Sequence, residues 1–345
     1  MTISVIIPVY NVEQYIERCL DSVMMQHCDG FTIECILVDD CSPDRSMDIV
    51  RKKIGDYQGD DISFTIIRHE VNKGLSAARN SGIVAATGEF LYFLDSDDMI
   101  TENAFKSLLS YFFNYFDVDM VMGNTFFEEN SALQNETVTD NCSTPVFFDD
   151  NDAIMMMVLR RQLNRYSWNK LIKRAFILKY NLFFDVGLLY EDVTWSYRLF
   201  SSVSSFLLVP AVTYIYKYNP SSIVHTHHQR ALHIVNSFSF ISDYIFNHPP
   251  IQVGGGRFYS AHRLFVYYWM MHAIDCKDKY EVFLEEGHRL ESLKRDMIYD
   301  ALRHFHPLLA AFFLTMFSPW KSLLKYSWFR RNVDRINKMV FRLSW

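Results

Sequence analysis

Three closely spaced carboxylates follow a short apolar run in the first third of the chain. Asp95, Asp97 and Asp98 come directly after Phe90–Leu94, a segment that predicts a buried β-strand. Carboxylates this close repel one another unless a cation or a proton relieves the charge, and Mg²⁺ and Mn²⁺ prefer such hard oxygen ligands. We therefore predict a divalent-metal site at this point, and a solvated acidic turn is the alternative interpretation.

A second acidic pair, Glu191-Asp192, lies shortly before the aromatic segment Trp195–Phe200, which predicts a helix. Acidic residues at a helix N-terminus complement the helix dipole, so the pair has a purely structural interpretation. The residues alone do not choose between that role and a chemical one.

Alternating strand-like and helix-like segments are expected to position the first carboxylate cluster. Apolar, β-branched runs predict four strands, at Ile3–Val9, Ile33–Val38, Phe64–Ile67 and Phe90–Leu94. Helical spacing predicts three connecting helices, at Val12–Met24, after a Ser42-Pro43 cap, and at about Ser76–Ala86, closed by Gly88. This alternation specifies an α/β fold with a Rossmann-like, doubly wound, mostly parallel sheet.

Polar side chains stand at the carboxyl ends of these strands, where ligands of doubly wound sheets bind. Tyr10-Asn11 follows the first strand, Asp39-Asp40 the second, and Asp95–Asp98 the fourth. We therefore expect three separate segments to converge on one crevice.

Composition and missing motifs exclude several classes of protein. The net charge of −6 argues against a nucleic-acid-binding protein, which usually has a basic balance. Pro8–Asn11 lacks the glycines of a dinucleotide-binding turn, and Gly254–Gly256 is not followed by the Lys and Ser or Thr of a P-loop. The six cysteines show no zinc or redox spacing. The chain begins without the cationic lead and long apolar core of a signal peptide, so we expect a cytoplasmic protein.

Six sequence blocks resemble, in order, those of the family 2 glycosyltransferases, in particular bacterial GT-A-fold enzymes of polysaccharide assembly. The blocks are Ser4–Asn11, Val38–Ser42, Asn72–Asn80 with Gly82, Asp95–Asp98, Trp168–Leu171 and Glu191-Asp192. The resemblance covers about residues 3–220. It implies an inverting hexosyl- or N-acetylhexosaminyltransferase that takes a sugar from a nucleotide sugar, with UDP as the expected nucleotide. The implied acceptor is a saccharide or lipid-linked saccharide of cell-surface polysaccharide synthesis.

The resemblance also implies which residues bind the donor and a metal ion. Asp40 is expected to accept a hydrogen bond from the uracil ring, and Lys73 and Arg79 are expected near the diphosphate. Asp97 and Asp98 are the expected ligands of Mn²⁺ or Mg²⁺. The expected nucleotide-sugar-binding residues are Pro8, Tyr10, Asn11, Asp40, Lys73, Arg79, Asp95 and Ser96.

Catalysis and acceptor binding are assigned by the same resemblance. Asp192 is the expected general base that takes the proton of the acceptor hydroxyl, and Glu191 is expected to orient it. Trp168, Asn169 and Lys170 are expected at the acceptor, with a core role as the alternative for Trp168. His225 or His227 would complete the metal shell in one interpretation, and both are solvated or ring-packed histidines in the other.

We expect the chain to have three parts, of which the resemblance covers the first two. Residues 1–110 form the expected nucleotide-sugar-binding half of the GT-A domain, residues 111–220 the acceptor-binding half, and residues 221–345 a helical C-terminal region. The tail Lys321–Trp345 carries seven Lys or Arg against one acidic residue, after the apolar segment Pro307–Trp320. This composition predicts attachment to the inner face of the cytoplasmic membrane. A homodimer interface, or a cover for the acceptor-binding half, is the alternative role of the tail.

Two rival functions and one departure from the family pattern complete the prediction. A sugar nucleotidylyltransferase usually begins with a glycine-rich phosphate loop, which is missing here, and a nucleotide-sugar-binding module without turnover does not need a carboxylate at Asp192. Polymerising synthases carry a Q-x-x-R-W motif after the base, whereas Gln162–Tyr166 precedes Glu191. No apolar run reaches the roughly 18 residues of a membrane span. We therefore predict single sugar addition, while no motif specifies the donor sugar, the acceptor or the linkage.

Overall fold

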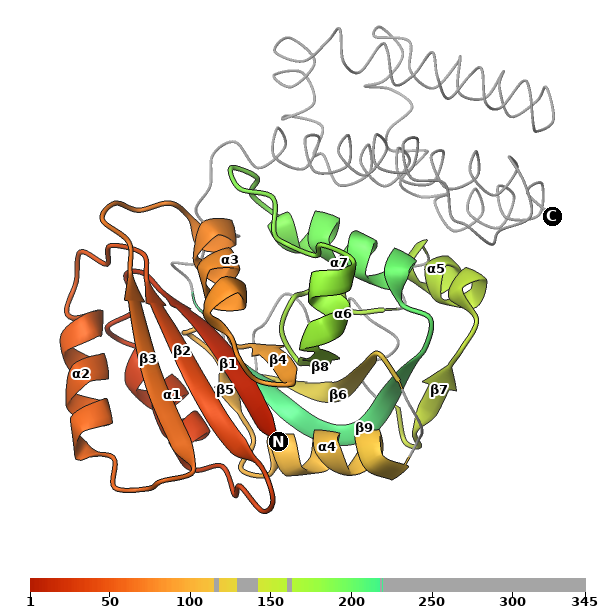
Figure 1. Ribbon diagram of the computed structural model, residues 1–345, viewed down its shortest axis with the longest axis horizontal. Helices are drawn as coiled ribbons and strands as arrows, with labels where there is room; N and C mark the ends of the chain where they lie inside the picture. The colour runs from red at the N-terminus through yellow and green to blue at the C-terminus, as the bar shows by residue number, and fades with distance from the viewer. Residues whose placement is uncertain (115–117, 129–141, 160–162, 218, 220–345) are drawn as a thin grey trace, which may run out of the picture. The chain divides into compact units, whose positions relative to one another are not determined.

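The computed structural model describes residues 1–114, 118–128, 142–159, 163–217 and 219 (Figure 1). The chain divides into two compact units, Met1–Thr226 and His227–Trp345. The predicted helical C-terminal region, the basic tail, His225 and His227 lie outside the described residues. Within the described part, no helix has the length and apolar character needed to cross a bilayer.

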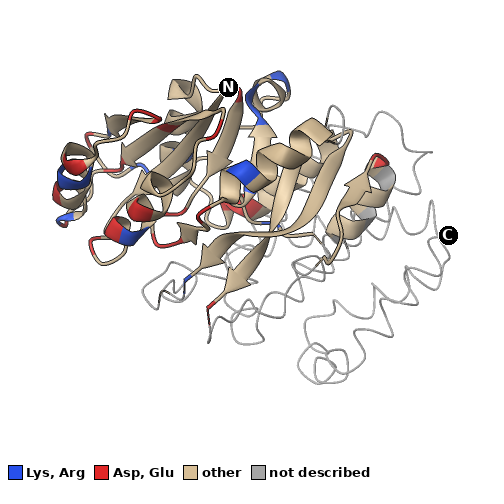
Figure 2. Ribbon diagram, turned by 90° about the horizontal axis from the view of Figure 1, so that it is seen from below, with Lys and Arg blue, Asp and Glu red and all other residues tan. Residues whose placement is uncertain are grey.

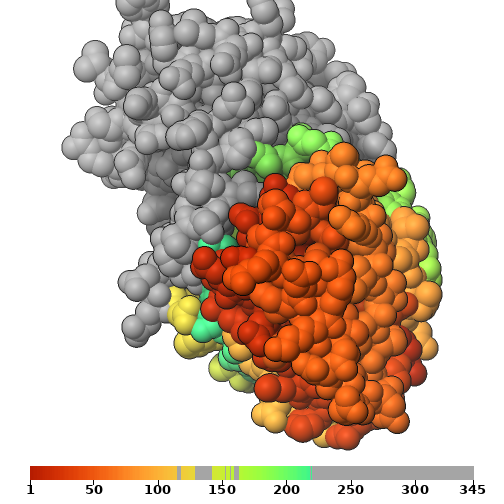
Figure 3. Space-filling view, turned by 90° about the vertical axis from the view of Figure 1, so that its left-hand side faces the viewer, coloured from red at the N-terminus to blue at the C-terminus, as the bar shows by residue number. Residues whose placement is uncertain are grey.

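Four parallel strands form the N-terminal half of the sheet, side by side in the order β3-β2-β1-β4 (Figure 1). Three helices connect them in sequence, so the predicted β-α alternation is confirmed. The elements are β1 Thr2–Val9, α1 Ile16–Met24, β2 Thr32–Asp39, α2 Ser46–Asp56, β3 Ile62–Arg68, α3 Leu75–Ala85 and β4 Phe90–Phe93. Seen from the side of α2 and β3, this N-terminal part makes one continuous surface (Figure 3).

The starts of two helices differ from the predictions, and the end of a third is close to its prediction. α1 begins at Ile16, since the Val12 carbonyl accepts from the backbone N–H of Tyr15 and Ile16 in a turn. Ser42 does not cap α2; its hydroxyl donates to Asp44 at 2.7 Å and accepts from the backbone of Asn11. α3 runs from Leu75 to Ala85, within one residue of the predicted bounds, and Gly88 lies beyond its end. A Cβ on Gly88 would lie 2.7 Å from the Thr2 carbonyl oxygen, so close passage of β1 requires this glycine.

The second half of the sheet is mixed rather than parallel. β8 runs antiparallel between β4 and β6, β9 runs parallel to β6, and β5 and β7 pair antiparallel with β9. Helix α4 and strands β5 and β6 were not predicted, although the buried residues of α4 recur at helical spacing. The elements are β5 Met99–Ile100, α4 Ala104–Asn114, β6 Met120–Phe127, β7 Val146–Phe148, α5 Asn151–Leu159, β8 Lys170–Lys173, α6 Arg174–Lys179, α7 Glu191–Ser202 and β9 Phe206–Tyr216.

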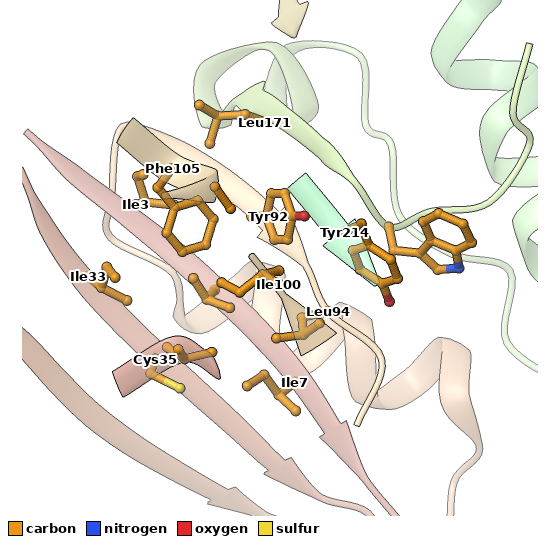
Figure 4. Close-up of a cluster of buried hydrophobic side chains, with 14 of the residues drawn as sticks. Ile3, Ile7, Ile33, Cys35, Tyr92, Leu94, Ile100, Phe105, Leu171 and Tyr214 are labelled. Carbon is orange, nitrogen blue, oxygen red and sulfur yellow. The ribbon is translucent and has the colours of Figure 1, made fainter. Parts of the chain in front are cut away.

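One apolar core joins the two halves of the sheet (Figure 4). Ile3 and Ile33, from neighbouring strands, are buried together with Tyr92 of β4. The Tyr92 ring meets Phe105 of α4 edge-on, with ring centroids 5.0 Å apart. Side chains of the strands are mostly uncharged, and charged residues gather on helices and loops (Figure 2). The core therefore fixes the strand ends that carry the polar residues.

Candidate active site

The parallel register brings the three predicted polar segments to one edge of the sheet. Val9 pairs with Asp39, so β1 and β2 end at the same level, whereas β4 ends at Phe93 opposite Ile6, three residues before the end of β1. The ladder continues beyond the strands, because Asp40 donates its backbone N–H to Val9 and Leu94 donates to Ile6. Tyr10, Asp40 and Asp95 therefore follow three adjacent strand ends, as the sequence predicted.

Arg79 of α3 connects this edge to the second acidic pair. Its Nη2 donates to Asp95 Oδ1 at 2.7 Å, and its Nη1 donates to Glu191 Oε1 at 2.6 Å and to Asp192 Oδ1 at 3.1 Å. The Arg79 side chain is only 1% exposed, and its guanidinium lies 5.1 Å from the centre of the Phe184 ring. Arg79 was expected near the diphosphate, and in this structure its guanidinium is enclosed by three carboxylates.

The charges in this cluster do not balance. Burial by itself would lower the pKa of Arg79, but Asp192, Asp95 and Glu191 outweigh it and raise that pKa. Burial, and then the neighbouring Asp192 charge, raises the pKa of Glu191 to about 7. The pKa of Asp192 is also raised, first by burial, while Arg79 opposes the rise. Three carboxylates share one guanidinium, so one of them holds a proton readily near neutral pH.

Asp97 and Asp98 lie in different surroundings although they are adjacent. Asp98 is 1% exposed; it accepts from the Tyr214 hydroxyl at 2.7 Å and from the Lys217 backbone N–H at 2.8 Å. Asp97 is half-buried, and its Oδ2 accepts from Asn219 at 2.8 Å. Burial raises the pKa of both carboxyls, and Asp95 raises that of Asp97 further. Asp98 thus anchors the end of β9, which argues against its predicted role as a metal ligand.

Asp95 and Asp97 can supply some, but not all, of the ligands of a hard divalent cation. Within the described residues, no group of three or more histidine, cysteine or acidic side chains is arranged to hold a metal ion. Asp97 and the 25% exposed Asp95 side chain each use one oxygen in the hydrogen bonds described above. Their second oxygens offer two hard ligands. Mg²⁺ and Mn²⁺ often bind through one or two carboxylates, with phosphate and water completing the shell, so the pair fits such an ion.

Asp40 holds the loop between β3 and α3 in place. Its Oδ1 accepts from His69 Nδ1 at 2.6 Å and from the Lys73 backbone N–H at 2.8 Å, and its Oδ2 accepts from the Gly74 backbone N–H at 2.8 Å. His69 is 5% exposed, whereas the Lys73 side chain is exposed. Gly74 has φ +88°, a left-handed conformation that favours glycine.

The other residues predicted to bind the nucleotide sugar differ in how far they are exposed to solvent. Tyr10 is 47% exposed and presents its ring at the end of β1, and Asn11 beside it is exposed with a φ of 55°. Pro8 is buried within β1, opposite Val38, so it supports the strand end instead of framing a base. Ser96 is also buried, at 8% exposure.

The Trp168–Lys170 block lies inside the protein, which corrects the expectation that it contacts an acceptor. Trp168, 2% exposed, is stacked between Tyr166 and Tyr214, with ring centroids 4.6 Å and 4.4 Å away. The buried Asn169 amide donates to the carbonyls of Gly123 and Asn124, tying β8 to β6. The Lys170 ammonium donates to the carbonyls of Tyr166 and Trp168. Trp168 is therefore a core residue, which was its alternative interpretation from the sequence.

Some residues around the site were not predicted. His69 directly follows β3, and polar residues beyond the other parallel strands were the signal that identified Asp40 and Asp95, so the same reasoning could have found it. Asn80 was quoted only within a motif, yet its amide exchanges two hydrogen bonds, of 2.7 and 2.8 Å, with the Phe184 backbone. The sequence offers no signal that Tyr214 is the partner of Asp98, because the two residues are 116 positions apart in the chain.

Comparison with known proteins identifies similar chains. The model of the family described as "Glycosyl transferase family 2" matches residues 4–187. The uncharacterized glycosyltransferase EpsJ of Bacillus subtilis is 31% identical over 240 residues, which are 67% of this chain and 65% of EpsJ. The putative glycosyltransferase EpsH of the same organism is 32% identical over 233 residues, 66% of this chain and 64% of EpsH. The match therefore spans slightly less than two thirds of these relatives.

A solved structure shares the fold. The crystal structure of S. aureus TarS 1–349 in complex with UDP-GlcNAc has a TM-score of 0.67 and 18% sequence identity, covering 87% of this chain and 81% of that chain. At this identity the likeness concerns the fold, and it confirms the predicted GT-A type of α/β sheet.

Proposed function

Because this chain belongs to glycosyl transferase family 2, it is an enzyme that transfers sugars, and we propose that it is an inverting transferase using a UDP-sugar. Membership of this family favours a transferase over a nucleotidylyltransferase or a binding module without turnover. The observation that carries the proposal is the Arg79 cluster, which holds Asp95 of the donor side and Asp192 of the acceptor side on one guanidinium.

The donor half of the proposed site consists of the strand ends of β1, β2 and β4. Tyr10 offers an exposed ring on which a base can stack, and Asp40 offers a carboxylate oxygen to an N–H of the base edge. TarS, which shares the fold, was crystallised with UDP-GlcNAc. We therefore take uracil as the base, with Asn11 and Lys73 as further contacts of the nucleotide.

Asp97 and Asp95 are the proposed ligands of a Mn²⁺ or Mg²⁺ ion. When bound, such an ion supplies positive charge to the departing diphosphate. Asp98 is left to position the turn through Tyr214 and Lys217.

Asp192 is the proposed general base. Its side chain is 20% exposed, against 9% for Glu191, so it is the more accessible of the two to an acceptor hydroxyl. Arg79 donates a hydrogen bond to its carboxylate and favours the charged form. The acceptor hydroxyl gives its proton to Asp192 as its oxygen attacks the anomeric carbon. The diphosphate leaves from the opposite face, and a single displacement of this kind inverts the configuration.

The acceptor and the cellular location are proposed together. We propose a saccharide or lipid-linked saccharide acceptor, residues 1–110 and 111–220 as the donor and acceptor halves, and a hexose or N-acetylhexosamine as the transferred sugar. The basic tail Lys321–Trp345 would hold the enzyme at the inner face of the cytoplasmic membrane. Co-sedimentation of the full chain, and of a chain ending before Pro307, with anionic vesicles tests this. Equal sedimentation of both chains would contradict it.

The activity is tested by thermal stabilisation and by donor turnover. UDP, UDP-glucose, UDP-N-acetylglucosamine, GDP-mannose and CDP are each added with and without Mn²⁺. The release of UDP from the stabilising nucleotide sugar, with water as the acceptor of the sugar, is then followed. We expect metal-dependent stabilisation by uridine nucleotides in the wild type and in Asp192→Asn, and UDP release in the wild type alone. Stabilisation by GDP-mannose but not by UDP-sugars would overturn the choice of donor.

A further inference from the structure

A buried chain of side chains runs behind Asp40, the carboxylate proposed to meet the donor base. Asp40 Oδ1 is 2.6 Å from His69 Nδ1, and His69 Nε2 is 2.9 Å from the Ser81 hydroxyl of α3. Asp40 is 2% exposed and His69 is 5% exposed. The proposed transfer chemistry does not use His69 or Ser81, so their arrangement needs another explanation.

Backbone contacts place the His69 ring against Asp40. The His69 N–H donates to the Asp39 carbonyl at 2.8 Å, which extends the β2–β3 ladder by one residue. Arg68, one position earlier, points its guanidinium at Asp39, with Nε 3.6 Å from Oδ2. Successive side chains of a strand point to opposite faces of the sheet. At the end of β3, the Arg68 side chain therefore points to Asp39 and the His69 side chain points to Asp40. The pairing is thus built into the sheet.

Counting acceptor positions shows what His69 does to Asp40. A carboxylate has about four lone-pair positions, two on each oxygen. On Oδ1, His69 and the Lys73 N–H occupy both; on Oδ2, Gly74 occupies one. Within the described residues, a single position on Oδ2 remains. Donors on both oxygens also prevent the carboxylate from rotating, so that position has a fixed direction.

We propose that His69 is a positioning residue that fixes the Asp40 carboxylate and thereby sets the enzyme's preference for a uracil nucleotide. This inference rests on the proposed function, in which Asp40 meets the donor base. The fixed Oδ2 position accepts one N–H, which uracil provides at N3. Cytosine has a lone pair at the same ring position, and a held carboxylate repels it. A carboxylate free to rotate discriminates less between the two bases.

The test measures the ratio of UDP to CDP affinity, because the two ligands share the ribose and the diphosphate. Calorimetric titrations with Mn²⁺ are compared for the wild type, His69→Leu and His69→Asn. Leucine removes the donor to Asp40, whereas the Asn side-chain amide can place an N–H near the Nδ1 position. We expect the preference for UDP to fall about tenfold or more in His69→Leu, and to be largely retained in His69→Asn.

Two further variants separate positioning from general loss of structure. Ser81→Ala removes the hydroxyl partner of His69 Nε2 and leaves the hydrogen bond from His69 to Asp40 in place. It should therefore lower the ratio of UDP to CDP affinity by a smaller factor. This variant still tests the inference if His69→Leu does not fold. His27→Gln replaces an exposed histidine that pairs with Glu102, and should leave the ratio unchanged. A merely structural defect would weaken UDP and CDP binding equally.

The outcomes distinguish this inference from the proposed function. A wild type that does not prefer UDP over CDP would contradict the role of Asp40 itself. A wild type that prefers UDP, with the same preference in His69→Leu, would overturn the role of His69 and leave the proposed function standing. If His69→Leu does not fold, Ser81→Ala decides, and an unchanged ratio in that variant would overturn the inference.

Discussion

Arg79 and Asp192 stand 113 positions apart in the sequence and share a hydrogen bond of 3.1 Å. The same guanidinium holds Asp95, so one buried cation links the turn after β4 to the start of α7. A shift at either end therefore changes the distance between the proposed metal ligands and the proposed base. Reactions that depend on such positioning lose about 10²-fold in rate when groups move by about 1 Å.

Replacement of Arg79 by lysine is expected to disrupt this link. One ammonium cannot donate in the directions of all three carboxylates, and a buried ion cluster that loses a partner is destabilised by roughly 3 kcal/mol or more. We expect Arg79→Lys to lower both the free energy of unfolding, measured in urea, and turnover. Arg51→Lys, at an exposed pair with Asp48, is the control and should change stability by less than about 0.5 kcal/mol. Wild-type turnover in Arg79→Lys would show that the cluster does not position the base.

The two acidic residues at the start of α7 should respond differently to amide substitution. Asp192→Asn is expected to keep the affinity for the UDP-sugar and to lose about 10²-fold or more in turnover, the scale of a positioned general base. Glu191→Gln should lose far less, because Glu191 is more deeply buried and bonds to Arg79. Single-turnover assays with the acceptor measure both. The reverse order of losses would assign the base to Glu191.

The adjacent residues Asp97 and Asp98 offer a matched pair for the metal proposal. Asp97→Ala should abolish the Mn²⁺ dependence of UDP binding in calorimetry while the protein stays folded. Asp98→Ala should keep that dependence and lower the free energy of unfolding by about 1–3 kcal/mol for each partner left unpaired, namely the Tyr214 hydroxyl and the Lys217 N–H. Unchanged metal dependence in Asp97→Ala would remove Asp97 from the ligand set.

Stability should fall as pH rises through the range set by Glu191. Its pKa is raised from 4.5 to about 7 in the folded protein, so between these values the folded state binds more protons than the unfolded state. The free energy of unfolding then decreases with increasing pH across this window. Urea denaturation from pH 4.5 to 7.5 should show this slope in the wild type and a flatter one in Glu191→Gln. A slope identical in both proteins would place the extra proton elsewhere.

Trp168 should affect stability rather than acceptor binding. Its ring is stacked between Tyr166 and Tyr214, so Trp168→Ala is expected to lower the free energy of unfolding by about 3–5 kcal/mol. Trp168→Phe keeps an aromatic ring in the stack and should leave the acceptor KM close to that of the wild type. A large rise in KM with unchanged stability would return Trp168 to the acceptor site.

The sequence by itself determined the parallel half of the sheet and where acidic residues stand relative to its strands. The strands from β1 to β4 are nearly continuous apolar runs, and the helices between them have apolar residues at helical spacing, so local pattern is enough to identify them. Asp40 and Asp95 were singled out because each lies just beyond a predicted strand, and Asp192 because it belongs to an acidic pair at the start of a predicted helix. Such positions depend on the neighbouring residues alone.

The tertiary structure decided what each polar residue contacts and how deeply it is buried. Arg79 was expected at the diphosphate and lies among carboxylates, Asp98 was expected at a metal and anchors β9, and Trp168 was expected at the acceptor and lies in the core. The antiparallel insertion of β8 between β4 and β6 was equally invisible, because strand order depends on packing between distant segments. Burial and hydrogen-bond partners are set by contacts across the whole fold, and no local periodicity encodes them.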